Sequence, residues 1–459
     1  MADTSVEPAK GLPKEPQVAQ PQHRATKASR GGFRWLVIFL LFYITVANYI
    51  DRSAIAFATG DIKTELGLGP AEIGLILGAF GLGYAVTTFL GGIAVDRWGA
   101  RSVLLIAAVT WTASIGVTGF AGSFLTLYIA RTVLGIAEGP NFPALTGAVS
   151  RWLAPHERAI ALGNTLVAVP LALTIGAPVS TQLIYAFGWR GMFFALTLLS
   201  AIWIPLWLIF FRNDPAQSRF VSDAELKHIR GGVEAQRDRT LGHVRHGFTD
   251  WRLLLTNRTL LANYWAFFVF GYFLFFFMTW LPNYLAQTYN LNVREVGLFT
   301  ILPWACAAVL LVALGYLSDY LLAQTGRLRI SRSMLIGVTQ LLAALAVIPI
   351  GFTNSLTVAI ACITVAVAFS MGANASYYAV NVDIVPERAA TALGIMDTGF
   401  AISGFIAPAI TGWVVGTFGS FQYAFLLMGG LALSSVLVVL LFHRPDEDRA
   451  DRPLMPAAG

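Results

Sequence analysis

The sequence predicts an all-α membrane protein with 12 transmembrane helices in two pseudo-symmetric six-helix halves. Three observations carry this prediction. Of the 459 residues, 56% are hydrophobic and only 12% are charged, whereas soluble domains carry about 25% charged residues. Apolar runs of about 20 residues, long enough to cross a bilayer as a helix, recur along the chain. Motifs of the first half also return, in the same order, in the second half.

Polar segments set the domain boundaries. The N-terminal segment is rich in Pro, Lys and Gln, and no apolar region with a small-residue cleavage site precedes the first span. We therefore expect a disordered cytoplasmic tail and no signal peptide. The longest polar stretch divides the spans into six plus six. The resulting plan is a tail at 1–32, a six-helix bundle at 33–211, a cytoplasmic linker at 212–258, a second six-helix bundle at 259–443 and a cytoplasmic tail at 444–459.

Short loops separate the 12 spans, and their basic residues orient the chain. Most of the 31 Lys and Arg residues lie in the termini, the linker and the loops of the same side, whereas the opposite loops hold only Lys63, Arg190 and Arg294. This bias predicts cytoplasmic termini, and it explains the net charge of +6 without nucleic-acid binding. The predicted spans cover residues 33–60, 71–95, 101–121, 124–150, 160–187, 191–211, 260–286, 296–322, 331–351, 356–383, 390–418 and 421–442.

The two halves repeat short sequences at matching places. GGIAVDRWGAR follows the second span, and GYLSDYLLAQTGR follows the eighth. PHERAIALG precedes the fifth span, and PERAATALG precedes the eleventh. Related six-span halves are typical of transporters with a pseudo-twofold axis and a binding site at the midplane between the halves.

The first of these loops resembles the loop motif of the major facilitator superfamily nearly residue for residue. The second copy keeps Gly315, Asp319 and Arg327 but has Tyr320 where the motif has a basic residue. The resemblance covers the chain after the tail and implies the 12-helix fold of that family. It also implies a latch, in which the Asp at a helix end bonds a neighbouring helix or an Arg in one conformation only. The residues assigned to this gating motif are Gly92, Asp96, Arg97, Gly99, Arg101, Gly315 and Asp319.

Four further stretches resemble the anion:cation symporter branch, which includes sugar-acid transporters and the sialin and vesicular glutamate transporter group. They are NYIDR in the first span, RTVLGIAEGPNFP in the fourth, WLAPHER after it and FFMTWLPNY at the end of the seventh. This resemblance implies a proton-coupled symporter that takes up an organic carboxylate anion by alternating access, and not an enzyme.

Arg131 and Glu138 are the two charged residues of the fourth predicted helix before its polar end. Their spacing places both on one helix face, about 10 Å apart along the axis. A charge at the bilayer centre costs about 2.5 kcal/mol or more, so it persists where it faces a partner or a cavity. One explanation is an ion pair that braces two helices. The other is an anion site, because a guanidinium fits a carboxylate and Arg52 supplies a second one.

The resemblance assigns roles to these residues. In the similar sugar-acid transporters, the positions of Asp51 and Glu138 are the proton-coupling acids, and those of Arg52, Arg131 and Tyr84 bind substrate or belong to its network. Burial favours the neutral form of a carboxyl, and a nearby Arg favours the charged form. A carboxyl that alternates between these settings can load and release a proton.

Two positions depart from the sugar-acid transporters. Asn164 is kept, but Val167 replaces a Gln, which removes an amide that would bind a hydroxyl. Asp397 stands where many relatives carry Asn. It is a second coupling site, a partner for a cationic part of the substrate, or a polar residue bonded to a helix or water. Tyr272, in the aromatic seventh span, matches a region that closes over substrate, and together with Val167 it favours a less polar organic acid.

An exchanger or exporter of organic anions or phosphate esters is the alternative function. The six His residues lie in tails or loops, and Cys306 and Cys362 lack metal-ligand spacing. No P-loop sequence occurs either, so we expect no metal, cofactor or ATP site, and a proton gradient as the energy source. We expect the partners to be the anion and the lipid bilayer, and the protein to be a monomer in a plasma membrane, the inner membrane of a bacterium.

Overall fold

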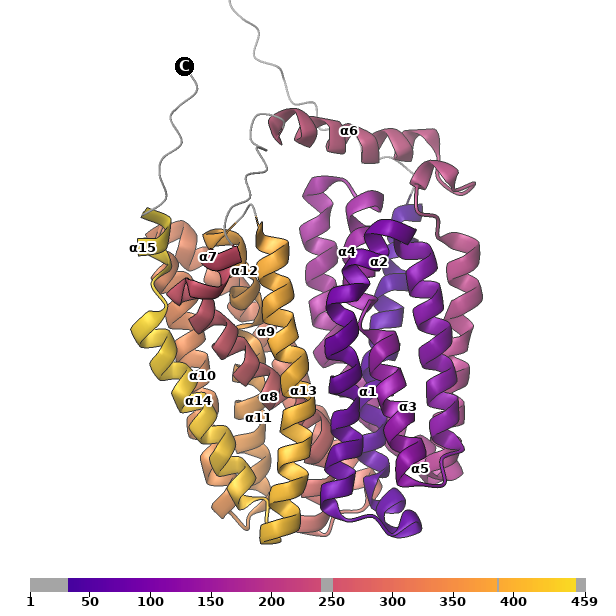
Figure 1. The fold of residues 1–459 in the computed structure, drawn as a ribbon, viewed down its shortest axis with the longest axis vertical. Coiled ribbons are helices and arrows are strands. Elements are labelled where there is room, and N and C mark those ends of the chain that lie inside the picture. The colour runs from indigo at the N-terminus through magenta and orange to yellow at the C-terminus, as the bar shows by residue number, and fades with distance from the viewer. Residues whose placement is uncertain (1–31, 241–250, 386–387, 451–459) are drawn as a thin grey trace, which may run out of the picture.

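The computed structural model describes residues 32–240, 251–385 and 388–450 (Figure 1). Within these ranges every regular element is a helix, which confirms the predicted all-α class. The predicted tail at 1–32 lies almost entirely outside the described residues, and so does much of the tail at 444–459.

The first bundle contains five helical segments. Two of them turn at a glycine with positive φ, a backbone conformation that glycine adopts without a Cβ clash. Gly99 in the second segment has φ +80°, and Gly188 in the fifth has φ +70°. Each glycine joins two of the predicted spans into one continuous element. The elements are α1 (Phe33–Leu66), α2 (Pro70–Gly119), α3 (Phe124–Glu138), α4 (Asn141–Trp152) and α5 (Pro155–Phe210).

The linker contains η1 (Pro215–Gln217), α6 (Asp223–Thr240) and α7 (Trp251–Thr256). Helix α6 lies across one end of the first bundle (Figure 1), and we call this side of the molecule the linker face. Glu225 of α6 is buried and accepts hydrogen bonds from the backbone N–H and Nη1 of Arg34, at 3.0 and 3.2 Å. This contact ties α6 to α1.

The second bundle stands beside the first (Figure 1). Its elements are α8 (Arg258–Tyr289), α9 (Val293–Thr325), a π-helical turn at Arg329–Ser333, α10 (Met334–Val347), a 3₁₀ turn at Ile348–Phe352, α11 (Leu356–Gly372), α12 (Asn374–Ile384), α13 (Ala389–Phe418), α14 (Gln422–Phe442) and α15 (Pro445–Ala450).

Ten helical stretches of the described residues are long and apolar enough to cross a membrane. One of them, α5, contains two predicted spans, and α3 and α4 together form the fourth, which accounts for the 12 predicted spans. The span at 124–150 is not one unbroken helix. The helix breaks at Gly139 and Pro140, because proline has no N–H to continue the backbone ladder.

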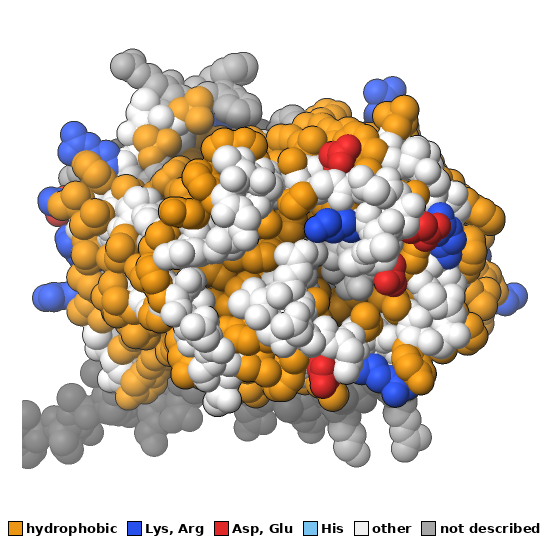
Figure 2. Space-filling view, turned by 90° about the horizontal axis from the view of Figure 1, so that it is seen from below, with side chains coloured by type: hydrophobic (Ala, Val, Ile, Leu, Met, Phe, Trp, Pro, Cys, Tyr) orange, Lys and Arg blue, Asp and Glu red, His pale blue; other side chains and the backbone are white. Residues whose placement is uncertain are grey.

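The bundles are in contact on the side opposite the linker face. A Cβ added to Gly74 of α2 would lie 2.8 Å from the Cα of Gly412 of α13, so these helices pack backbone against backbone. Nearby, Asn283 donates a hydrogen bond to the hydroxyl of Thr59 at 3.3 Å, which joins α8 to α1. We call this side the closed face. Figure 2 shows it as a surface on which isolated charged side chains lie among uncharged ones.

Candidate functional site

Four charged residues of the first bundle lie together between α1 and α3. Asp51 and Arg52 lie halfway along α1, and Arg131 and Glu138 lie on α3. Each is 1% exposed or less. Buried charges need a partner, a proton or a ligand, because no water solvates them.

Arg52 and Glu138 form an ion pair. The Nη2 and Nε atoms of Arg52 lie 2.9 and 3.2 Å from Oε2 of Glu138. Nη2 also donates to Oδ1 of Asn48, one helical turn earlier, at 3.1 Å. Within the described residues, Nη1 of Arg52 and Oε1 of Glu138 have no hydrogen-bond partner. The pair therefore keeps one free donor for an anion and one free oxygen for a proton.

Three aromatic rings surround the Arg52 guanidinium. It lies 4.4 Å from the ring centre of Tyr49, 4.3 Å from that of Phe80 and 5.0 Å from that of Tyr84. Ring faces attract a cation and exclude water from it. Tyr84, a candidate from the sequence, thus lies next to the buried guanidinium of Arg52. Tyr49 and Phe80 were not predicted, since nothing in their spacing distinguishes them from core residues.

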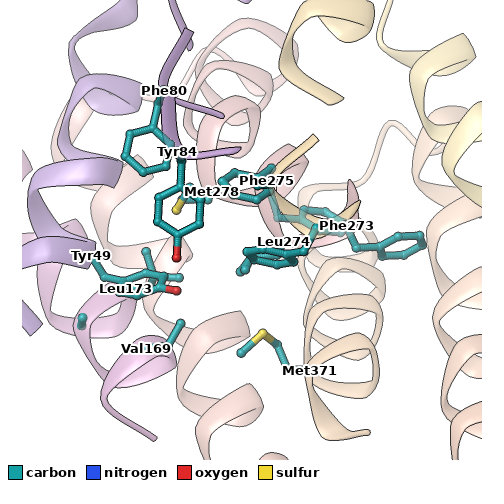
Figure 3. Packing of buried hydrophobic residues seen from close by; sticks show 14 of the residues in the cluster. Tyr49, Phe80, Tyr84, Val169, Leu173, Phe273, Leu274, Phe275, Met278 and Met371 are labelled. Atoms are coloured by element: carbon teal, nitrogen blue, oxygen red, sulfur yellow. The ribbon is translucent and has the colours of Figure 1, made fainter. Parts of the chain in front are cut away.

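Figure 3 shows the space beside these rings. The hydroxyls of Tyr49 and Tyr84 point into it, and the apolar side chains of Leu173 and Met371 border it. A pocket between the bundles also uses Leu173. Its lining consists of Ser53, Phe57, Leu173, Phe277, Met278, Pro282, Thr300 and Trp304. Side chains of both bundles therefore enclose a largely apolar pocket, and Ser53, the residue after Arg52, belongs to its lining.

Arg131 does not bond Glu138, although both lie on α3. Its Nη2 donates to the main-chain carbonyl of Arg52 at 3.1 Å, and its guanidinium lies 5.5 Å from the ring centre of Phe80. Its Nε has no hydrogen-bond partner among the described residues. Arg131 thus supports the segment that carries Arg52 and adds a second positive charge behind it.

Asp51 has a different partner from Glu138. Neighbouring helical residues point about 100° apart, so Asp51 faces away from the Arg52 side chain. One of its oxygens accepts a hydrogen bond from the hydroxyl of Ser200, on α5, at 2.7 Å. The two acids predicted to carry protons therefore occupy separate settings. Ser200 was not predicted, because it lies 149 residues from Asp51 in the chain.

Asp397 is the third predicted acid, and it belongs to the second bundle. It lies on α13 and accepts a hydrogen bond from the hydroxyl of Tyr378, on α12, at 3.3 Å. Its side chain is partly exposed. Helix α13 packs against α2 of the first bundle, which carries Tyr84. The third acid thus lies on a helix of the second bundle that borders the first bundle.

Two predicted substrate residues lie outside this cluster. Asn164 is exposed near the start of α5, and it makes no hydrogen bond to the described residues. Tyr272 is 1% exposed, and its hydroxyl has no partner in the same ranges. Neither side chain contacts Arg52, Glu138 or Asp397 in the structure.

In the gating motif of the first bundle, the later residues, Gly99 and Arg101, contact Asn213. Gly99 packs against the side chain of Asn213, which also accepts a hydrogen bond from the backbone N–H of Arg101 at 2.9 Å. Asp96 and Arg97 are exposed, and Asp96 forms no ion pair within the described ranges. Gly92 has open space around its Cα. The latch that the resemblance implies is not engaged here.

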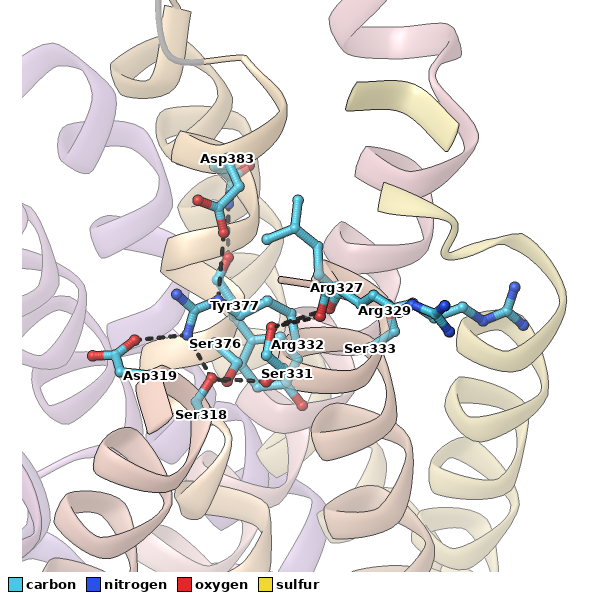
Figure 4. Close-up of polar contacts among 12 residues, drawn as sticks. Ser318, Asp319, Arg327, Arg329, Ser331, Arg332, Ser333, Ser376, Tyr377 and Asp383 are labelled. Carbon is cyan, nitrogen blue, oxygen red and sulfur yellow. Dashed lines mark hydrogen bonds and ion pairs between the residues drawn. The ribbon is translucent and has the colours of Figure 1, made fainter. Parts of the chain in front are cut away.

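The second copy of the motif is engaged (Figure 4). Nη1 of Arg332 lies 3.0 Å from an oxygen of Asp319, and its Nε lies 3.4 Å from Asp383. Arg332 also donates a short hydrogen bond to Ser318. Gly315 lies one turn before Asp319 without close contact. Arg332 was not predicted, because the sequence motif points to Arg327 as the basic residue.

One cluster has metal-ligand residue types. His156, Glu157 and His228 offer ligand atoms within 4.8 Å of one another at the linker face. Both oxygens of Glu157 already accept hydrogen bonds from Arg34, at 2.9 and 3.2 Å. A guanidinium bonded to the carboxylate disfavours a second cation, so this cluster does not fit a metal ion.

Comparison with known proteins gives a consistent picture. A family model described as Major Facilitator Superfamily matches residues 41–373 and 321–457. The chain is 33% identical to "Hexuronate transporter" of Bacillus subtilis (strain 168) over 413 residues, which are 89% of this chain and 94% of that protein. It is 33% identical to "Probable sulfoacetate transporter SauU" of Cupriavidus necator over 419 residues, which are 90% of this chain and 95% of that protein.

Solved structures share the fold at low sequence identity. A D-xylose-proton symporter superposes with a TM-score of 0.70 at 15% identity, covering 91% of this chain and 99% of that one. A bacterial homologue of the human lysosomal transporter Spinster, in its inward-facing and unoccupied conformation, superposes with a TM-score of 0.68 at 18% identity, covering 92% and 96%.

Proposed function

The chain belongs to the major facilitator superfamily, and from this premise we propose that it takes up an organic carboxylate anion together with protons. The observation that carries the proposal is the buried pair of Arg52 and Glu138, with one free donor and one free oxygen. Relatives named for hexuronate and sulfoacetate transport support an anionic substrate.

Substrate binding is coupled to proton binding because the substrate carboxylate and Glu138 compete for Arg52. A substrate carboxylate entering the space beside Tyr49 and Tyr84 takes donors of Arg52 that now bond Glu138. Glu138 then loses the cation that favours its charged form, and burial favours binding of a proton. Loss of that proton restores the ion pair and releases the anion. Arg131 contributes positive charge to the anion, and Asp51, bonded to Ser200, carries a proton in a separate place.

Alternating access supplies the movement. The closed face is sealed by the contact of Gly74 with Gly412, so substrate leaves this conformation through the linker face. We place the linker face and both termini in the cytoplasm of a bacterial inner membrane, and we propose that a monomer is the transporting unit. In this proposal the two bundles that move against each other are residues 33–211 and 259–443. The exposed Asp96 fits a latch that opens when the linker face is open.

Uptake into proteoliposomes tests this function. Purified protein is reconstituted, and glucuronate, sulfoacetate and short mono- and dicarboxylates are supplied with an acidic exterior. We expect at least one anion to accumulate above its external concentration and to stop accumulating when a protonophore removes the gradient. An exchanger would instead require internal anion and would ignore the protonophore. Accumulation that depends only on internal anion would contradict the proposal and favour exchange.

A further inference from the structure

Asp397 is a carboxylate that has no cationic partner in the part of the chain that the structure describes. Among the described residues its only hydrogen bond comes from the neutral hydroxyl of Tyr378, at 3.3 Å, and it forms no ion pair. By contrast, Glu138 is paired with Arg52. A lone carboxylate at membrane depth is costly unless a proton or a positive charge neutralises it. Because Asp397 is partly exposed, a ligand can reach it.

Aromatic rings pack against Tyr378, the residue that donates a hydrogen bond to this carboxylate. The ring of Phe267, on α8, packs edge to face against that of Tyr378, with 5.6 Å between the ring centres. Its ring centre also lies 5.4 Å from that of Phe400, which follows Asp397 by about one turn on α13. Helix α13, which carries Asp397, also packs against α2 of the first bundle, which carries Tyr84. A carboxylate combined with ring faces is the surrounding in which proteins hold ammonium groups.

The two charges lie on facing parts of the two bundles. The guanidinium of Arg52 lies over the rings of Tyr49 and Tyr84, and Tyr84 belongs to α2, which packs against the helix of Asp397. The hydroxyls of the two tyrosines point into the space between the bundles (Figure 3). The space therefore has a positive side on the first bundle and a negative side on the second. Apolar side chains such as Leu173 and Met371 lie along its border.

We propose that the substrate is a zwitterion, whose carboxylate binds Arg52 and whose ammonium group binds Asp397. This inference rests on the proposed function, which supplies the carboxylate at Arg52. A simple anion would leave Asp397 uncompensated and would be repelled by it. A cationic nitrogen removes both costs and spans the two bundles, so its binding favours the conformation in which they close around it.

Matched ligand pairs test the charge directly. Isothermal titration calorimetry on the purified full chain compares glycine betaine with 3,3-dimethylbutyrate, 4-aminobutyrate with butyrate, and β-alanine with propionate. Each pair keeps the carboxylate and removes the positive charge. In the wild type we expect at least one zwitterion to bind about tenfold or more tightly than its partner, which is the usual size of a hydrogen-bonded charge contact.

Two variants separate the charge of Asp397 from its hydrogen bond. Asp397→Asn keeps the size of the side chain, and we expect it to bring the affinity ratio to about one while simple carboxylates bind more tightly. Tyr378→Phe removes the hydrogen bond but keeps the charge, and we expect it to retain the preference for the zwitterion.

The outcomes are distinct. If glucuronate, sulfoacetate or a simple carboxylate binds and no zwitterion is preferred, or if Asp397→Asn leaves the ratio intact, the inference is overturned and the proposed function stands. If folded protein binds no carboxylate or zwitterion of the panel, the proposed function falls and this inference falls with it. A zwitterion preference that disappears only in Asp397→Asn supports the inference.

Discussion

Arg52 and Glu138 lie 86 residues apart in the chain, yet their side chains meet at 2.9 Å inside the protein. Both are 1% exposed or less. Removing one partner of such a pair strands the other charge, which costs about 3–5 kcal/mol in proteins generally. A substrate carboxylate that replaces Glu138 avoids that cost only if Glu138 gains a proton. This relation makes the pair the centre of the proposed coupling and leads to the predictions below.

Glu138→Gln is expected to separate exchange from accumulation. The amide can still accept a hydrogen bond from Arg52 but cannot release a proton. Uptake driven by a pH gradient should be lost, whereas counterflow of labelled substrate, which needs no net proton movement, should continue. Glu65→Gln is the control, because Glu65 is exposed and paired with Arg190. Concentrative uptake at the wild-type rate in Glu138→Gln would remove this acid from the mechanism.

Arg52→Lys is expected to weaken anion binding about 10- to 100-fold, the effect of losing one charge-assisted hydrogen bond. Lysine keeps the charge but lacks the fork that reaches a carboxylate and Asn48 together. Arg131→Lys should weaken binding less, since Arg131 bonds the Arg52 carbonyl and sits behind it. Titration calorimetry with the transported anion measures both. A larger loss in Arg131→Lys would make Arg131 the main anion-binding residue.

Gly74→Ala is expected to hold the closed face open. The new Cβ would lie 2.7 Å from the carbonyl oxygen of Pro408 and 2.8 Å from the Cα of Gly412, so the helices must separate. Transport should fall, and a cysteine placed at Thr59 should become accessible to a membrane-impermeant thiol reagent from that side. Gly60→Ala is the matched control, because nothing lies within 4 Å of its added Cβ. Equal labelling in the two variants would argue against this gate.

Arg332→Ala is expected to destabilise the second bundle by about 2 kcal/mol, because it removes the shared partner of Asp319 and Asp383. Asp319→Asn should cost less than about 1 kcal/mol, since the Asp319 side chain is 76% exposed and water screens its charge. Thermal unfolding in detergent measures the difference as a lower midpoint for Arg332→Ala. Equal midpoints for the two variants would show that burial of Arg332 does not decide the effect.

The spans were predictable because a bilayer imposes length and hydrophobicity on each one. Breaks of the helix within a span were harder to predict from the sequence. Pro140 is visible in the sequence, but its effect depends on whether neighbouring groups tolerate an interrupted ladder. The break after Gly372 has no proline at all. The helix pairs joined at Gly99 and Gly188 depend on a positive φ, which glycine permits but does not require.

Buried charges were predictable, and their partners were not. Asp51, Arg52, Arg131 and Glu138 stand out because charges are rare in apolar segments. Which acid meets which base depends on how α1 rotates against α3, and hydrophobic patterns leave that angle free. The spacing of Arg131 and Glu138 suggested a shared face, but the nearest base to Glu138 comes from α1. Neutral partners such as Ser200 or Tyr378 carry no such signal, because their types are common in cores.

Proton movement during substrate entry tests the central claim most directly. Proteoliposomes that contain a pH-sensitive dye, with equal pH on both sides, receive the transported anion from outside. The account predicts that the interior becomes more acidic as the anion enters the wild-type vesicles, and that Glu138→Gln vesicles show no such change while still exchanging labelled anion. Anion uptake without a change of internal pH in the wild type, or the same acidification in Glu138→Gln, would contradict it.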